Sequence, residues 1–423
     1  MNTTDTNMPE IIKAQRELDA GLAENADALE TTPPIERSPD RLVSLDAFRG
    51  TIMLLMASSG FGIPQVAKHF SGSAVWAFLG YEFEHPPWAG FSLWDIIQPS
   101  FMFMVGVAVP WSVANRIARG QSFSQMIRHA MLRALLLVLL SIFLQSTWSK
   151  QTDWSFTNVL AQIGLGYPFL FLLAFASPRK QWLTAFAILF FYWLLFALYP
   201  LPGPGRFDSL GSISPPHQVV FADHWSKNWS PAARFDEWFL NLFPREKPFT
   251  EQSGGYLTLN FIPSLATMIF GLIAGRVLRD EGAITEKLRR LVKAGIAGIV
   301  LGLALHWSGL CPIVKRIWTP SWTLVSGGVV VLILAGFVAV IDWRGKKKWA
   351  FPLVVAGLNP ITLYVMWQIM AGGVRGRIKI HFGQQVFESF GATYAPMLER
   401  ISVLIVFWVI LYWMYRRKIF IRI

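Results

Sequence analysis

Long apolar segments recur from residue 47 to residue 415, and they restrict the fold of this chain more than any other feature of its sequence. A helix that spans a membrane needs roughly 20 mostly apolar residues. Ten segments approach or meet that requirement: Ala47–Val66, Ser92–Val113, Met126–Gln145, Phe156–Phe175, Trp182–Tyr199, Leu257–Leu278, Val292–Trp307, Trp322–Ile341, Pro352–Ala371 and Ile401–Tyr415. The sequence therefore predicts an all-α polytopic membrane protein, built as a bundle of about ten transmembrane helices.

The composition agrees with a membrane protein. Apolar residues make up 53% of the chain and charged residues only 15%, whereas about a quarter of the residues in a typical soluble domain are charged. A net charge of +12 would suggest a nucleic-acid partner in a soluble chain. Basic cytoplasmic loops explain it more simply here, so the expected partner is the lipid bilayer and not nucleic acid. Cys311 is the only cysteine, which excludes a disulfide within the chain.

Lys and Arg residues concentrate in alternate loops between the apolar segments, around residues 116–128, 179–180, 276–293, 344–348 and 416–422. Basic residues are enriched in cytoplasmic loops. With ten spans, both termini then face the cytoplasm, and the loop that contains His85 faces the outer side of the membrane.

Two stretches lie outside the predicted bundle. Residues 1–40 are polar and end in a proline-containing segment, which is typical of a disordered cytoplasmic tail that precedes a membrane domain over residues 41–423. Residues 200–256, between the fifth and sixth helices, are too polar to span the membrane but rich in Trp and Phe. Interfacial aromatic residues favour an outer loop with short helices that packs on the membrane surface or caps the bundle.

His85 and Asp95 are the main candidates for chemistry. An imidazole titrates near neutral pH, which suits a general base or nucleophile, although a lone loop histidine is more often surface decoration. Asp95 lies in the first turn of the second predicted helix, where Ser92-Leu-Trp-Asp95 fits a capping box and an acid complements the helix dipole. The alternative is that Asp95 orients or charges His85; the residues favour the cap, and both roles are compatible.

Further polar residues interrupt the apolar segments. Asp46 and Arg49, three residues apart, either neutralise each other on one helix face or present Arg49 to an anionic ligand. Gln98 shares a helix face with Asp95 and extends a polar stripe inward. Asn260 begins the sixth segment and Asn359-Pro360 break the ninth, and polar residues beside a helix break line a cavity or satisfy freed backbone groups. No His pair or Cys cluster has metal-ligand spacing, so no metal is expected.

Several motifs, taken in order, resemble those of the heparan-α-glucosaminide N-acetyltransferase-like membrane proteins. They are Arg41-Leu-Val-Ser44-Leu-Asp46-Ala-Phe48-Arg49-Gly50, His85-x-x-Trp88-x-Gly90, Asp95-Ile-Ile-x-Pro99-x-Phe101-x-Phe103-x-x-Gly106, Val159-Leu-x-x-Ile-Gly164, Gly357-Leu-Asn359-Pro-Ile-Thr-Leu-Tyr364 and Tyr415-Arg-Arg-Lys-Ile-Phe420. The resemblance extends over nearly all of residues 41–423.

The resemblance implies an acetyltransferase that takes acetyl-CoA or another acyl-CoA on the cytoplasmic side and modifies a sugar or glycan on the other side. The family's active histidine falls on His85 and its aspartate on Asp95, with Trp88 and Gln162 as further candidate binding residues. The chain departs from the animal pattern at Gly60, Ala161-Gln162 and Gly254, so the heparan-type acceptor does not carry over. It is similar to a bacterial branch of the family, which implies the inner membrane, with a homodimer as a candidate assembly.

Two function hypotheses follow. The leading one is an acyltransferase that moves an acyl group from a cytoplasmic thioester to an amino or hydroxyl group of an external sugar, with His85 as base or acyl carrier. The alternative is a transporter or flippase for a sugar or glycolipid, in which His85 and Asp95 sense protons. Helix breaks near the midplane are common in transporters, but the structural repeats that often accompany them are not visible in this sequence.

Overall fold

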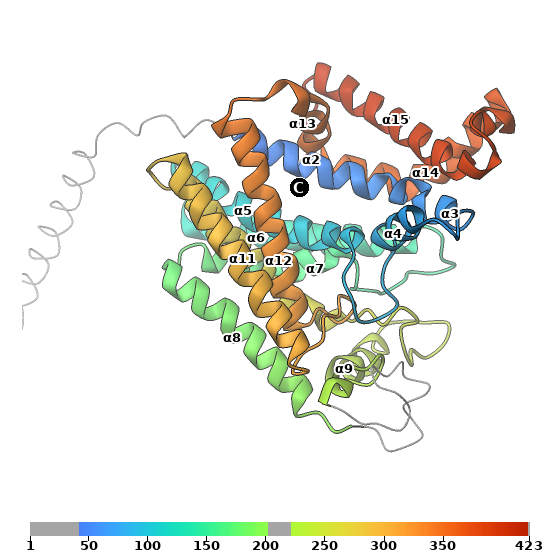
Figure 1. The fold of residues 1–423 in the computed structure, drawn as a ribbon. Helices are drawn as coiled ribbons and strands as arrows, with labels where there is room; N and C mark the ends of the chain where they lie inside the picture. Colours follow the sequence, from blue (N-terminus) through green and yellow to red (C-terminus); the bar gives the residue numbers. More distant parts are fainter. Residues whose placement is uncertain (1–41, 202–220, 422–423) are drawn as a thin grey trace, which may run out of the picture. The chain divides into compact units, whose positions relative to one another are not determined.

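The fold is known from a computed structural model, which describes residues 42–201 and 221–421 of the 423-residue chain. These residues form helices joined by turns and loops, with no strand among them (Figure 1). The α-helices are α2 (Val43–Ala57), α3 (Ile63–Ala67), α4 (Ala74–Glu82), α5 (Ile97–Ile117), α6 (Phe123–Ser146), α7 (Val159–Leu173), α8 (Pro178–Ala197), α9 (Pro231–Leu240), α10 (Phe261–Arg279), α11 (Ile284–Trp307), α12 (Pro320–Phe337), α13 (Phe351–Leu358), α14 (Pro360–Phe382) and α15 (Ala395–Arg416). The predicted tail, residues 1–40, and residues 202–220 of the predicted outer loop lie outside the described residues.

The all-helical prediction is confirmed, but the count of about ten membrane spans is not. Six of the described helices are long and apolar enough to cross a membrane, or up to eight if each of two bent helix pairs counts as one span. The two remaining predicted segments are α7, which has only 15 residues, and a part of α11, which is not among the six. The number of long apolar helices indicates an integral membrane protein.

The first and ninth predicted segments are each broken in two. Between α2 and α3 the chain bends by 44°, and Gly60 and Gly62 adopt positive φ angles of 70° and 71° at the bend, where a residue with a Cβ would be strained. At Asn359-Pro360 the bend between α13 and α14 is 69°. Proline removes a backbone donor and blocks the preceding turn, so the predicted break at this site is confirmed.

Glycines set the closest helix contacts. A Cβ at Gly106 of α5 would lie 1.9 Å from the carbonyl oxygen of Met268 on α10. A Cβ at Gly50 of α2 would lie 1.7 Å from the carbonyl oxygen of Leu353 on α13. Small residues let membrane helices approach backbone to backbone. The glycines of the seventh predicted segment serve the same purpose, since α11 and α12 lie side by side through them (Figure 1).

Residues 221–256, called the outer segment after their predicted location, form a short 3₁₀ helix and α9, so the prediction of short helices is confirmed. The buried Trp225 stacks on Phe196 of α8, with ring centroids 4.9 Å apart. The Arg245 side chain donates to the carbonyl oxygen of Trp154, which precedes α7. This segment therefore packs against the end of the bundle where α8 stops and α7 begins.

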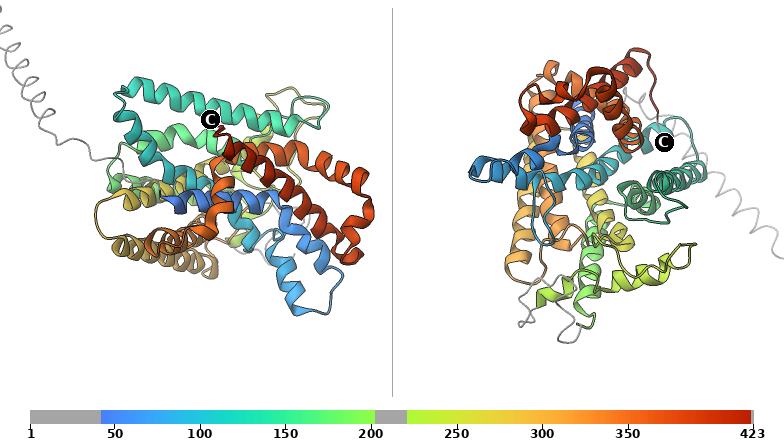
Figure 2. Two further views of the ribbon diagram at one scale, coloured as in Figure 1. Left: turned by 90° about the horizontal axis from the view of Figure 1, so that it is seen from above. Right: turned by 90° about the vertical axis from the view of Figure 1, so that its right-hand side faces the viewer.

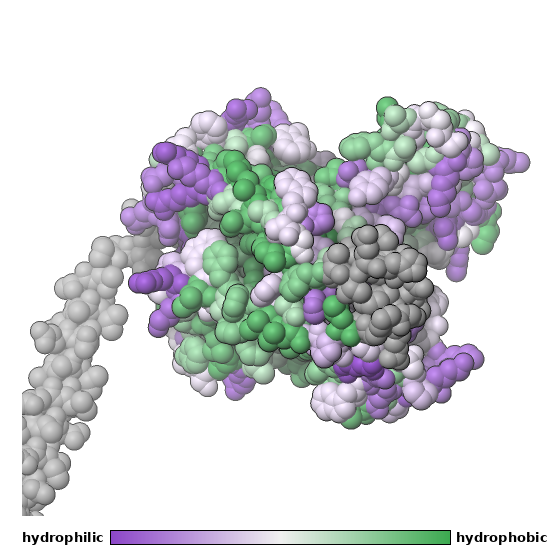
Figure 3. All heavy atoms as spheres, turned by 60° about the horizontal axis from the view of Figure 1, so that its bottom comes forward, coloured by the Kyte–Doolittle hydropathy of each residue, from purple (hydrophilic) through white to green (hydrophobic). Residues whose placement is uncertain are grey.

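Apolar and hydrophilic residues gather on different parts of the molecular surface. In Figure 3 apolar residues cover the middle of the visible face, and hydrophilic residues gather toward its left and right margins. On one side, α14 and α15 lie next to each other (Figure 2), joined by ion pairs from Arg375 and Lys379 to Glu399. Apolar surface of this kind matches a bilayer environment, in which lipid tails replace water.

We expect Gly106→Ala to destabilise the protein by about 1–3 kcal/mol, because the added methyl group would overlap the backbone of α10. Gly372→Ala in α14 is the matched control, since no atom lies within 4 Å of its added Cβ. Alanine at that site favours the helix, so its thermal midpoint should stay the same or rise. Equal midpoints for the two variants in detergent would contradict the packing described here.

Candidate functional site

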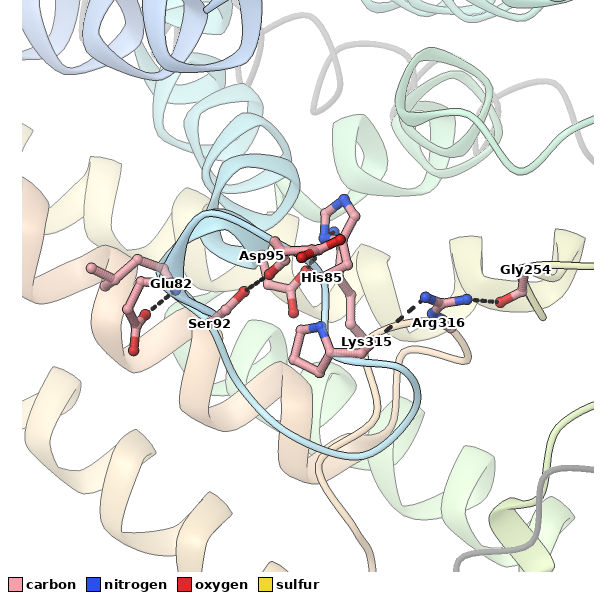
Figure 4. A network of polar contacts seen from close by, with 10 residues as sticks. Glu82, His85, Ser92, Asp95, Gly254, Lys315 and Arg316 are labelled. Atoms are coloured by element: carbon pink, nitrogen blue, oxygen red, sulfur yellow. Dashed lines mark hydrogen bonds and ion pairs between the residues drawn. The ribbon is translucent and has the colours of Figure 1, made fainter. Parts of the chain in front are cut away.

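Three ionisable side chains from separate segments meet at one end of the bundle. His85 lies in the loop after α4, Asp95 in the 3₁₀ turn Leu93–Ile96 before α5, and Lys315 in the loop between α11 and α12. Nδ1 of His85 is 2.5 Å from Oδ1 of Asp95, and Nζ of Lys315 is 2.9 Å from the same oxygen. Figure 4 shows these side chains converging. The Asp95 and Lys315 side chains are 2% and 8% exposed, whereas that of His85 is 40% exposed.

The carboxylate of Asp95 fixes the tautomer of His85. An ionised carboxylate only accepts hydrogen bonds, so the proton of the contact belongs to Nδ1 of His85. With that proton in place, the 3.3 Å contact between Nζ of Lys315 and the same Nδ1 is not a hydrogen bond. The lone pair of the neutral ring then lies on Nε2, on an exposed side chain. This is the arrangement of a general base oriented by an acid.

The predicted contact between His85 and Asp95 is present. Asp95 lies in the first turn as predicted, but the predicted capping box is not formed. The Ser92 side chain makes no capping hydrogen bond to the turn that follows it. It donates instead to the carbonyl oxygen of Glu84 at 2.8 Å. A buried carboxylate gains more from a cation and an imidazole donor than from a helix end, so the tertiary partners displace the local cap.

Backbone hydrogen bonds hold the His85 loop against its neighbours. The amide of Gly90 donates to the carbonyl oxygen of Ile313, two residues from Lys315. The amide of Leu93 donates to Oε2 of Glu82 at the other end of the loop (Figure 4). These contacts tie both the start and the end of the loop, which restricts the orientation of the imidazole.

Arg316 links the site to the outer segment. Its guanidinium donates to the carbonyl oxygens of Gly254, at 2.7 Å, and Pro86, at 3.4 Å (Figure 4). The predicted binding residue Asn260 donates from Nδ2 to the carbonyl oxygen of Arg316 at 2.8 Å. Asn260 therefore holds the loop that carries Lys315, which makes it a positioning residue in this structure.

Sequence reasoning missed Lys315. The sequence patterns assign no role to this residue. The available signal was the pair Lys315-Arg316 in a loop that the charge pattern predicts to be poor in basic residues. A buried lysine needs a partner, and Asp95 is the partner.

The other predicted residues near the site differ in their contacts. Trp88 donates from Nε1 to the carbonyl oxygen of Trp225, and its ring lies against Gly255, where a Cβ would be 2.6 Å away. Gln162 is fully buried and donates to the carbonyl oxygens of Phe156 and Thr258. Both residues fasten the outer segment to the bundle. Gln98 lies half-buried in the first turn of α5, and no hydrogen bond of the site within the described residues reaches it.

Asp46 and Arg49 form the predicted ion pair, with NH1 of Arg49 3.4 Å from Oδ1 of Asp46. They lie in the first two turns of α2, whereas the bend after that helix places Gly60 next to Phe83 in the His85 loop. Fifteen helical residues extend roughly 22 Å. The pair and His85 therefore lie at opposite ends of α2, and the structure does not bring them together.

The side chain of Asn359 forms hydrogen bonds with backbone groups. It is fully buried, donates from Nδ2 to the carbonyl oxygen of Ile419 and accepts from the amide of Ile421 through Oδ1. These bonds hold the C-terminal segment at the break between α13 and α14. Of the two predicted roles for polar residues at a helix break, the contacts support satisfaction of backbone groups.

Among the described residues, no group of three or more His, Cys, Asp or Glu side chains is arranged to hold a metal ion. The cluster also pairs its one carboxylate with a lysine, and a cation in that place would compete with a metal. The geometry supports acid–base chemistry at the exposed imidazole.

Two curated proteins are similar to this chain over most of its length. The human heparan-alpha-glucosaminide N-acetyltransferase is 22% identical over 439 residues, covering 90% of this chain and 60% of its own length. The mouse protein of the same name is 22% identical over 386 residues, covering 79% of this chain and 54% of its own length. The chain thus spans less than two thirds of each relative, and no family model matches it. These matches support the resemblance stated above as a distant relationship.

We expect Lys315→Met to destabilise the protein by about 3 kcal/mol, because it leaves the carboxylate of Asp95 buried without its cation. Lys247→Ala, at an exposed lysine of the outer segment, is the control and should have little effect. The double variant Asp95→Asn/Lys315→Met removes both charges and should regain most of the loss. Thermal unfolding in detergent measures all three, and a double variant no more stable than Lys315→Met would refute the pairing.

The buried carboxyl group of Asp236 on α9 is expected to make the stability of the folded protein depend on pH. It is fully buried and accepts from the amide of Thr258 at 2.9 Å, and burial raises its pKa from 3.8 to about 6. The folded state then binds the proton more tightly than the unfolded chain, so stability is lost as the pH rises from about 4 through about 6. The shift corresponds to a loss on the order of 3 kcal/mol.

The expected result is that Asp236→Asn becomes more stable relative to wild type as the pH rises from 4.5 to 7, in thermal unfolding at each pH. Glu246→Gln, at an exposed carboxylate of the same segment, is the control and should keep a constant difference from wild type. A constant difference for Asp236→Asn as well would refute the prediction.

Proposed function

We propose that this protein is a membrane acyltransferase that moves an acetyl or other acyl group from a cytoplasmic acyl-CoA to an amino or hydroxyl group of a sugar on the other side of the membrane. The observation that carries the proposal is the cluster of His85, Asp95 and Lys315, with the imidazole exposed and its orienting acid buried. The distant similarity to proteins named heparan-alpha-glucosaminide N-acetyltransferase supports the reaction class.

The geometry suits His85 as the general base. Nε2 takes the proton from the acceptor's N–H or O–H group while the acceptor atom forms a bond to the acyl carbon. The carbon–sulfur bond then breaks, and the thiolate that leaves receives the proton back from His85. Proton transfer by a positioned base typically contributes 10² to 10⁴-fold in rate. The same Nε2 atom is also the one that would carry the acyl group if transfer proceeded through the histidine.

Asp95 and Lys315 have positioning roles in this proposal. Asp95 holds the ring in the tautomer that leaves Nε2 free to accept a proton, and it stabilises the imidazolium that forms. Lys315 compensates the charge of Asp95 in the resting state, so the buried pair is neutral. Protonation of His85 during the reaction then gives the cluster a single positive charge next to a carboxylate.

The basic end of the helix bundle is suited to a thioester donor that comes from the cytoplasm. The basic loops of the predicted cytoplasmic side lie together: Arg276 of α10 donates to the carbonyl oxygen of Ala174 after α7, and Arg279 to that of Pro110 in α5. Arg49, whose side chain is 25% exposed, lies at the start of α2. Guanidinium groups bind phosphates well, so we propose Arg49 as a contact for the donor.

The test is acyl transfer by purified protein in proteoliposomes, with labelled acetyl-CoA on one side and a panel of amino sugars on the other. We expect His85→Gln to lower the transfer rate by at least 10²-fold in protein that is still folded, as its thermal unfolding checks. His381→Gln, at an exposed histidine at the end of α14, is the matched control and should retain full activity. Asp95→Asn should lower the rate at saturating substrate more than it raises the KM, because it disturbs the tautomer and not binding.

Retained transfer in His85→Gln would remove His85 from the chemistry. A separate arm measures whether acetyl-CoA raises the thermal midpoint in wild type and in Arg49→Ala. No shift with any acyl-CoA, together with uptake of sugar in the absence of a thioester, would overturn the acyltransferase proposal.

A further inference from the structure

A cavity lies between α8, α10, α11 and α12, and none of its lining residues belongs to the cluster of His85, Asp95 and Lys315. Its volume is about 450 Å³, within the range of roughly 300–1,000 Å³ that is typical of small-molecule sites. One wall is aromatic: Trp182 and Phe186 of α8 stack with centroids 5.7 Å apart, and Phe270 of α10 lies 5.7 Å from Trp182. The proposed acyl transfer uses none of these residues.

The opposite wall consists of small residues on α11 and α12. Ala294 and Ala297 of α11 line the cavity and are themselves exposed, as is Leu301 one turn further along. On α12, Gly327 and Gly328 line it. Large side chains at these places would fill the space, so this cavity, called the groove below, exists because the residues are small. It opens between helices α8 and α11 on a surface that the apolar exposed residues indicate is in contact with lipid.

Positive charge marks one end of the groove. Arg290 and Lys293, in the second and third turns of α11, are lining residues. Arg290 pairs with Glu286 at 2.8 Å, but Lys293 forms no ion pair with any residue that the structure describes. From Lys293 to Leu301 the groove follows the helix for roughly 12 Å. It thus combines a cationic mouth with a deep apolar interior.

We propose that this groove binds one acyl chain of an anionic phospholipid, whose phosphate lies at Lys293 and Arg290. An apolar slot that opens sideways selects a molecule that already lies in the bilayer. The cations at its mouth select a negative headgroup, because each basic residue near the membrane surface favours anionic lipid. The start of α11 belongs to the basic loops, so the lipid comes from the leaflet on that side. This site does not depend on the proposed acyl transfer.

The experiment measures lipid binding to the full chain in mild detergent by native mass spectrometry. The probes are phosphatidylglycerol and phosphatidylcholine with identical acyl chains. Wild type should retain one phosphatidylglycerol molecule saturably, with an affinity about fivefold higher than for phosphatidylcholine, as expected for one basic residue. Lys293→Gln should reduce that preference to nearly none.

Two tryptophan substitutions on the same helix test the location. Ala297→Trp fills the groove and should abolish saturable retention. Ile296→Trp adds the same ring at an exposed neighbour that does not line the cavity, and it should bind as wild type does. Thermal midpoints check that both variants fold, and Ala294→Phe replaces Ala297→Trp if the latter does not.

Two results would overturn the proposal. One is equal retention of phosphatidylglycerol by the two tryptophan variants. The other is displacement of the lipid by palmitoyl-CoA, with tighter binding than phosphatidylglycerol that Ala297→Trp abolishes, since the groove would then belong to the thioester's acyl chain.

Discussion

The buried carboxylate of Asp95 is the constraint on which the rest of the site depends. A carboxylate that is 2% exposed at the head of an apolar helix is expensive unless a cation and hydrogen bonds compensate it. Lys315 supplies the charge and His85 supplies a donor. Because those two residues come from different loops, burial of one acid brings together the segments before α5 and before α12. The imidazole of His85 is held in place as a consequence of that pairing.

The contacts around the cluster form a second level of organisation. Asn260 and Gln162 bind carbonyl oxygens of the neighbouring loops, and Arg316 reaches the outer segment at Gly254. Each of these hydrogen bonds gives a backbone carbonyl of a connecting segment a side-chain donor. The outer segment is therefore part of the support of the site, and Asp236 fastens it through a bond that depends on pH.

The two ends of the helix bundle differ in their charged side chains. At the His85 end, a buried carboxylate is paired with a buried lysine and with an imidazole that remains exposed. At the other end, basic residues are numerous and exposed, and the groove beside Lys293 joins them to an apolar interior. An enzyme that transfers a group across a membrane would need both a cytoplasmic surface suited to anionic molecules and a dry, ordered site on the far side. The proposed acyltransferase reaction and the proposed lipid site use these two ends separately.

The sequence by itself determined the helical membrane class, because the length and apolarity of a segment are local properties that decide whether it lies in lipid or in water. It also predicted the break at Asn359-Pro360, because a proline interrupts a helix where it occurs, and it offered a contact between His85 and Asp95, which the structure contains. Only the tertiary structure decided what Asp95 binds, because Lys315 is 220 residues away and nothing in the local pattern encodes that contact. The count of about ten spans is not confirmed for a related reason: the apolarity of a segment does not determine whether its helix continues, bends or stops.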